Sequence, residues 1–159
     1  MNRLAVYFGR LVVILAGFLA ASLGASAFLH LLILGGLSWT PEEAVFVAGS
    51  FLFSVPFVAL FVGYFMLLPA MVAIVIAEML GRRDWLYFAL AGAASGLAVV
   101  YFHGFHSRAD GPFDPVAMSL VFAAAGAVGG ICYWLVAGRG SGRWMEGLND
   151  PSQSGQSGF

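Results

Sequence analysis

Charge is the scarcest feature of this sequence. Only 9% of its 159 residues are charged, whereas 61% are hydrophobic. Soluble domains carry about 25% charged residues, because a surface that faces water needs them. A chain with so little charge cannot cover such a surface. The composition therefore excludes a soluble globular protein and predicts one that is embedded in a lipid bilayer.

Lysine and cysteine are scarce as well. The chain has no lysine, and its net charge of −1 provides no basic surface for nucleic acid. Its single cysteine, Cys132, excludes an intramolecular disulfide and a structural zinc site built from cysteines. We expect Cys132 to be a packing residue within an apolar helix.

The few charges lie in short segments between long apolar stretches. A membrane span needs roughly 20 apolar residues to cross a hydrocarbon core of about 30 Å. The pattern predicts an all-α, polytopic integral membrane protein, a bundle of four transmembrane helices with a long kinked second helix. We expect a four-helix domain over residues 1–137, with spans at about 11–37, 42–68, 85–103 and 115–137.

Two segments carry signals for the start of a helix. Thr40-Pro41 is followed by Glu43, which is the pattern of a capping box with proline at the first helical position. Asp114-Pro115 repeats the cap and the proline. These signals predict that the second and fourth helices begin at Pro41 and Pro115.

The second apolar stretch is longer than one crossing requires. It runs to Leu80, which is about 55 Å as a straight helix. Pro56 and Pro69 each remove a backbone hydrogen bond and favour a kink. No polar turn divides the stretch into two crossings. We therefore expect a kinked extension from residue 69 to 80, at the cytoplasmic interface or beyond it.

The two ends of the chain allow further interpretations. Arg3, Arg10 and the apolar run that ends in Ala25-Ser26-Ala27 imitate a secretory signal peptide, so cleavage of residues 1–27 stays an alternative. The apolar character continues beyond residue 27, which favours a membrane span. Residues 138–159 are rich in Gly and Ser and predict a flexible cytoplasmic tail.

The arginines predict an orientation, because short cytoplasmic loops collect basic residues. A four-span arrangement leaves only Arg108 on the opposite side. The pattern predicts a multi-pass protein of the bacterial inner (plasma) membrane with both termini cytoplasmic. The arginines on the shared side are Arg3, Arg10, Arg82, Arg83, Arg139 and Arg143.

Small residues recur at intervals of four, the spacing that lets membrane helices approach closely. The predicted packing residues are Ala20 and Gly24 in the first helix, Gly92 and Gly96 in the third, and Gly126 and Gly130 in the fourth.

Ionisable residues inside the apolar stretches are functional candidates, because their burial is costly. Glu78 lies four residues before Arg82, which predicts an interfacial ion pair between them. His30 and His103 are weak candidates for haem ligands. We favour instead a neutral His30 bonded to a backbone carbonyl or a serine, and we expect no cofactor.

One polar segment has the residue types of a metal site. Imidazole and carboxylate groups bind zinc and similar ions, and the weak candidates are His103, His106, Asp110 and Asp114. Their spacing is not diagnostic, so a solvated loop without metal is the favoured interpretation.

We found no catalytic motif, and little charge lies within the spans. The sequence therefore favours a non-enzymatic accessory or scaffold subunit of the membrane. Its expected partners are the lipid bilayer and another membrane protein or a second copy of the chain. Two alternatives are a small oligomeric transporter or channel component and a haem or redox membrane anchor.

Overall fold

The protein is an all-α bundle of long apolar helices. The computed structural model describes residues 3–35, 40–102 and 114–141. Its helices are α1 (Arg3–Gly35), α2 (Pro41–Leu80), α3 (Trp85–Phe102) and α4 (Pro115–Val136), followed by the short 3-10 helix η2 (Gly138–Gly140). Four of them are long and apolar enough to cross a membrane. The predicted fold class is confirmed.

The predicted helix starts are confirmed at atomic detail. Thr40 accepts a hydrogen bond from the Glu43 backbone, and the Glu43 carboxylate accepts one from the Thr40 backbone in return. The Thr40 backbone, and to a lesser extent the Thr40 hydroxyl, donate to the Glu43 carboxylate and hold the pKa of Glu43 below its usual value. Asp114 caps α4 by accepting from the Val116 backbone at 3.0 Å.

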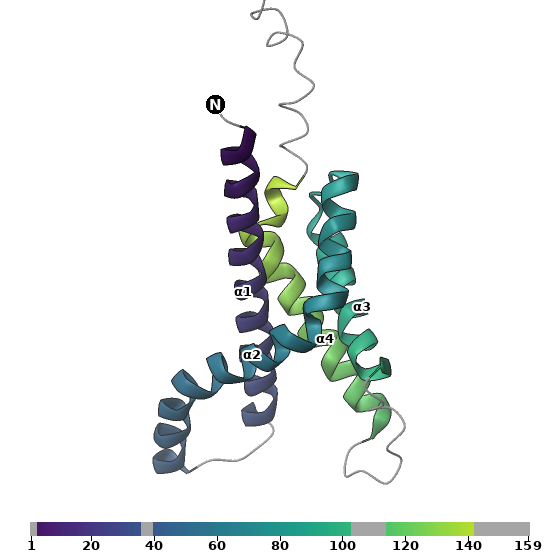
Figure 1. Cartoon of the computed structure of the whole chain (residues 1–159). Helices are drawn as coiled ribbons and strands as arrows, with labels where there is room; N and C mark the ends of the chain where they lie inside the picture. The colour runs from purple at the N-terminus through teal and green to yellow at the C-terminus, as the bar shows by residue number, and fades with distance from the viewer. Residues whose placement is uncertain (1–2, 36–39, 103–113, 142–159) are drawn as a thin grey trace, which may run out of the picture.

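The helices lie side by side, with α4 at the centre. The contact between α3 and α4 is the most extensive, and α1 packs on another side of α4. Figure 1 shows the start of α1, the turn between α2 and α3, and the end of α4 together at one end of the bundle. We name this the arginine-rich end, because it carries Arg10, Arg82, Arg83 and Arg139.

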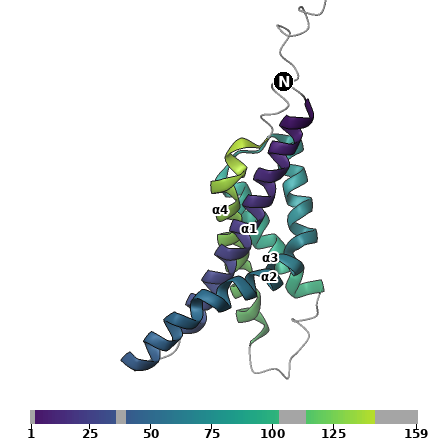
Figure 2. The ribbon, with the colours of Figure 1, turned by 60° about the vertical axis from the view of Figure 1, so that its left-hand side comes forward.

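Helix α2 departs from the bundle along its first half. In both views its start leans away from α3 and α4, whereas its last part runs alongside them (Figures 1 and 2). Pro56 and Pro69 lie within this continuous helix. Proline removes a backbone hydrogen bond and bends a helix, which accounts for the change in direction.

The last part of α2 is integrated in the bundle. We expected residues 69–80 to lie at the interface or beyond it, but this segment holds the deeply buried Ile74 and Ala77. They form the core with Phe88, Tyr133 and Ala137. The segment that leaves the bundle is the opposite half of the helix. A sequence pattern places the prolines but does not determine which half packs against the neighbours.

The segment after α4 also differs from the prediction. Gly138 and Ser141 are buried against the bundle, although we expected a flexible tail from residue 138. A Cβ built on Gly138 would lie 2.8 Å from the Phe88 ring, so this glycine permits the close approach. The rest of the predicted tail lies outside the described residues.

Candidate functional site

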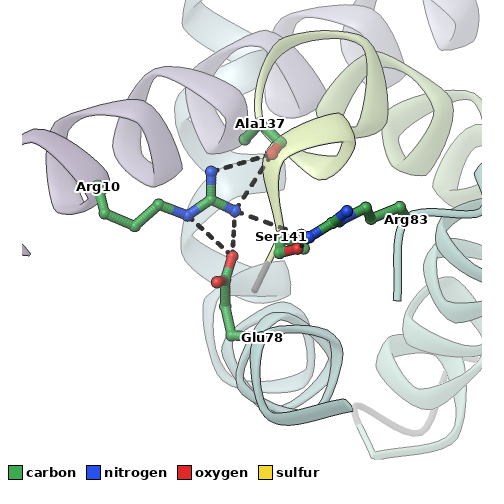
Figure 3. Close-up of polar contacts among 5 residues, drawn as sticks. All are labelled: Arg10, Glu78, Arg83, Ala137 and Ser141. Carbon is green, nitrogen blue, oxygen red and sulfur yellow. Dashed lines mark hydrogen bonds and ion pairs between the residues drawn. The ribbon is translucent and has the colours of Figure 1, made fainter. Parts of the chain in front are cut away.

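A polar cluster joins three segments of the chain at the arginine-rich end. The Arg10 guanidinium, from α1, forms an ion pair with Glu78 from α2 and donates to the Ala137 carbonyl after α4 at 3.2 Å (Figure 3). It also donates to the Ser141 hydroxyl at 3.3 Å. The Arg10 and Glu78 side chains are only 16% and 12% exposed. Burial to this degree makes the pair far more consequential than a surface salt bridge.

Helix geometry explains why a cation belongs at this place. Glu78 lies near the C-terminus of α2, and Ala137 caps the C-terminus of α4. Both ends carry partial negative charge and carbonyls without helical partners. The Arg10 guanidinium neutralises the charge of Glu78 and donates a hydrogen bond to the Ala137 carbonyl. Arg83 completes the cluster by donating to the Ser141 carbonyl at 3.0 Å (Figure 3).

The observed partner of Glu78 differs from the predicted one. The sequence spacing predicts a pair with Arg82, whereas the structure joins Glu78 to Arg10. Arg82 is 56% exposed and lies 3.8 Å from Asp84. The reason is the helix end: α2 stops at Leu80, and Gly81 adopts a left-handed conformation with φ of 60°. The four-residue spacing brings side chains together only while the helix continues.

The predicted packing glycines of α3 and α4 face one another. A Cβ on Gly92 would meet the Gly126 carbonyl oxygen, and one on Gly126 would meet that of Gly92. Gly96 lies against the Phe122 carbonyl, and Gly130 lies against the Phe88 carbonyl. The two backbones therefore touch directly, as small residues permit in membrane helices.

Helix α1 approaches α4 at the predicted Gly24 and at small residues outside the predicted pair. Gly24 lies against the Cys132 side chain, but Ala20 is only half-buried. Helix α1 also approaches α4 at Gly17, which packs against Ala137 and the Tyr133 ring, and at Ala21, whose carbonyl faces Gly129. Gly17 and Ala21 are also four residues apart. The spacing of small residues in the sequence therefore did not distinguish this pair from Ala20 and Gly24.

A cavity lies among the four helices. It has about 580 Å³ of empty space, which includes its open mouth. Its walls are almost entirely apolar and include Ala21, Val62, Met66, Ala91 and Gly129. Ser22 and Ser95 also line it, but each hydroxyl donates to a carbonyl within its own helix. These two hydroxyls therefore do not provide a polar path through the cavity for an ion or a polar solute.

Tyr133 connects this cavity with the polar cluster. It lines the cavity, is 4% exposed, and packs against Phe88 with 5.3 Å between the ring centroids. Its backbone carbonyl accepts from the amide of Ala137, the residue that binds Arg10. Within the described residues its buried hydroxyl makes no hydrogen bond. A buried polar group without a partner is costly, so this hydroxyl requires an explanation.

Three further polar side chains of the spans, those of His30, Ser26 and Tyr87, bond to backbone carbonyls. The His30 Nδ1 atom lies 2.8 Å from the Ser26 carbonyl, and the ring stacks edge-on against Phe51. A hydrogen bond to a carbonyl requires that Nδ1 carries a proton. The Ser26 hydroxyl donates to the Val55 carbonyl, and that of Tyr87 donates to the Ala73 carbonyl. These two bonds tie α1 and α3 to α2 close to its prolines.

The metal candidates do not form a site in the described part of the chain. His103, His106 and Asp110 lie outside the described residues, as does the second haem candidate. Asp114 is committed to capping α4. Within residues 3–35, 40–102 and 114–141 no group of three potential ligands comes together.

One face of α2 is apolar and highly exposed. It includes Leu60 (71% exposed), Tyr64 (77%) and Leu68 (78%). Tyr64 lies at the middle of the candidate span Gly49–Leu80. Its neighbour Gly63 packs against Ser22 near the middle of the α1 span, which places Tyr64 at central depth. In the described part of the chain its hydroxyl makes no hydrogen bond.

Sequence reasoning missed Arg10, Tyr133 and Ser141. The sequence assigned Arg10 only to the basic residues on the cytoplasmic side. One signal was present, because a four-span arrangement brings Arg10 and Glu78 to the same side of the membrane. No local spacing could pair them, since they are 68 residues apart.

The fold and these sites define a class of protein, namely a multi-pass membrane protein built from four helices. Comparison with known proteins does not narrow this class, because no protein-family model, no curated protein and no solved structure matches the chain.

Proposed function

We propose that this chain is a non-enzymatic accessory subunit that binds another integral membrane protein through the exposed face of α2. The observation that carries the proposal is Tyr64. Tyrosine is enriched at membrane interfaces, where its hydroxyl can reach water or lipid headgroups. A hydroxyl at central depth in hydrocarbon has no such partner, and leaving it unbonded is costly.

The course of α2 supports the same conclusion. A lipid-facing helix gains nothing by leaving its own bundle, because lipid tails are as apolar as its side chains. The first half of α2 nevertheless leans away, with Phe46 and Phe53 about four-fifths exposed. A helix of a partner protein fits against this face and supplies a hydrogen-bond acceptor to Tyr64.

The proposed location of the protein is the bacterial inner membrane, with both termini in the cytoplasm. The arginine-rich end would face the cytoplasm in a bacterial inner membrane, since basic residues are retained on that side. The grouping of Arg10, Arg82, Arg83 and Arg139 at one end supports this orientation.

Site-specific photocrosslinking in native membranes tests the docking face. A photoreactive residue at Leu60 should give a product with another membrane protein. The matched control is Leu19, which is 61% exposed on α1 and should give none. The substitution Tyr64→Phe should reduce the yield from Leu60 about three-fold, the value of one interhelical hydrogen bond in a membrane.

Each outcome decides between functions. A product of twice the mass of the chain, dependent on Tyr64, would refute the accessory role and favour a small oligomeric transporter or channel. Equal labelling from Leu60 and Leu19, or a yield unaffected by Tyr64→Phe, would show that the face of α2 simply contacts lipid.

A further inference from the structure

The arginine-rich end has more basic than acidic side chains. Its described side chains include the arginines Arg10, Arg82, Arg83 and Arg139 and the acids Glu78 and Asp84. Glu78 is paired with Arg10 inside the bundle. Asp84 lies 3.8 Å from the exposed Arg82. Across the described residues the exposed Arg139 forms no ion pair, so its charge is available to an anion.

Arg139 is held in place by an aromatic side chain. Its guanidinium carbon lies 4.6 Å from the centre of the Trp134 ring, a cation–π contact. The indole is fixed in turn, because its N–H donates to the Arg83 carbonyl at 2.7 Å. A cation–π contact involves no hydrogen bond, so it leaves the N–H groups of the guanidinium to donate elsewhere. In the described part of the chain nothing accepts from them.

Arg83 adds a second positive charge beside this contact. Its Nε donates to the Ser141 carbonyl at 3.0 Å, two residues beyond Arg139 (Figure 3). Because Trp134 is bonded to the Arg83 backbone, both arginines are tied to the same indole. Guanidinium groups match the geometry of phosphate oxygens, and side chains that are already ordered lose little entropy on binding. The pair therefore suits a phosphate group.

The surroundings indicate that this phosphate belongs to a lipid. Tryptophan is enriched where the hydrocarbon of a bilayer meets water, so Trp134 places Arg139 at the level of the headgroups. Leu135 and Val136, in the last turn of α4, are about half exposed and can contact acyl chains below the phosphate. A free phosphate ion would use the arginines but none of this apolar surface.

We propose that Arg139, held on Trp134, and Arg83 bind the phosphate of an anionic glycerophospholipid such as phosphatidylglycerol. A zwitterionic phospholipid has the same phosphate, but the cation of its headgroup would meet the positive charge of the arginine-rich end. The site therefore selects a lipid with net negative charge. It lies at the end of α4 and not on the docking face of α2, so each proposal can fail without the other.

The test uses the full chain in phosphatidylcholine vesicles that contain a trace of one of two photoactivatable lipids. Both probes carry the reactive group at the start of the same acyl chain, and their headgroups are those of phosphatidylglycerol and phosphatidylcholine. The measured quantity is the ratio of labelling by the two probes on the segment that ends α4. In the wild-type chain the phosphatidylglycerol probe should clearly exceed the other.

Three variants separate a built site from diffuse charge. Arg139→Gln should lower the ratio about five-fold, the preference that one arginine at the surface gives an anionic lipid. Arg82→Gln is the matched control, because this exposed arginine lies beside Asp84, and should change the ratio less than about two-fold. Trp134→Leu keeps every charge but removes the cation–π contact, and should lower the ratio about three-fold.

The site would be refuted by equal labelling of the end of α4 by both probes in the wild-type chain, a result that needs no variant. Equal losses in Arg139→Gln and Arg82→Gln, each shown to be folded by a thermal melt, would refute it as well. Excess inorganic phosphate at constant ionic strength should leave the labelling unchanged. Displacement of the lipid probe would show that the arginines bind free phosphate instead.

Discussion

At the scale of single residues, Arg10 holds the arginine-rich end together. Its guanidinium contacts Glu78 in α2 and, in the segment that follows α4, the Ala137 carbonyl and the Ser141 hydroxyl. The planar fork of arginine presents several donors in fixed directions, so one side chain can serve all three acceptors. A lysine has a single point of charge and cannot reproduce this arrangement.

Removal of Arg10 should therefore be costly. Arg10→Ala leaves Glu78 buried without its cation and should lower the free energy of unfolding by about 2–4 kcal/mol. Arg82→Ala removes an exposed charge and should change it by less than about 0.5 kcal/mol. Reversible denaturation in detergent micelles measures both values.

A double-mutant cycle provides the control. The variant Arg10→Ala/Glu78→Ala should be more stable than the sum of the two single losses suggests, because no charge is left unpaired. Additive losses would contradict a direct coupling between the two side chains.

At the same scale, the sequence identified some groups and misassigned others. Glu78 stood out as the acid within an apolar run, and the bond of His30 to a carbonyl agrees with the favoured interpretation. The partner of Glu78 was misassigned, because the left-handed Gly81 ends the helix before Arg82. Tyr133 gave no signal, since its neighbours from α1, α2 and α3 are distant in the sequence.

At the scale of elements, α3 and α4 form the rigid part of the bundle. Their contact is made by backbone against backbone at Gly92 and Gly126. Such an approach maximises van der Waals contact, which replaces the hydrophobic effect as a driving force in lipid. It also leaves no room for even a methyl group.

Substitution of alanine for a glycine should change the stability of the protein in opposite directions at a packed and at an open position. Gly126→Ala places a Cβ against the Gly92 carbonyl and should destabilise the protein by about 1–3 kcal/mol. Gly49→Ala has nothing within 4 Å and should stabilise it by about 0.5–1 kcal/mol, because alanine is the better helix former. Unfolding in detergent measures both, and a gain in stability for Gly126→Ala would contradict the close contact.

At the scale of the whole molecule, three segments that meet at the arginine-rich end restrict how the protein can be oriented in the membrane. The start of α1, the turn between α2 and α3, and η2 meet through Arg10 and Arg83. The Trp134 indole also donates to the Arg83 carbonyl at 2.7 Å. Any orientation must keep these segments on one side of the membrane.

Reporter fusions test the proposed orientation. Fusions in the turn at residues 82–84 and after residue 141 should both report a cytoplasmic location, because arginines resist translocation. A fusion within residues 104–112 should report the opposite side. Opposite locations for the first two would contradict the four-span arrangement, and periplasmic locations for both would contradict only its direction.

The sequence by itself determined the class, the long apolar helices and the starts of α2 and α4. Apolar length and capping are local properties, so Thr40 with Glu43 and Asp114 before Pro115 could be read directly. The tertiary structure alone decided the Arg10–Glu78 pair, the apolar cavity with the Tyr133 hydroxyl, and the half of α2 that leaves the bundle. These features depend on which helix faces meet, and in a chain that is apolar all round the sequence leaves that choice to packing.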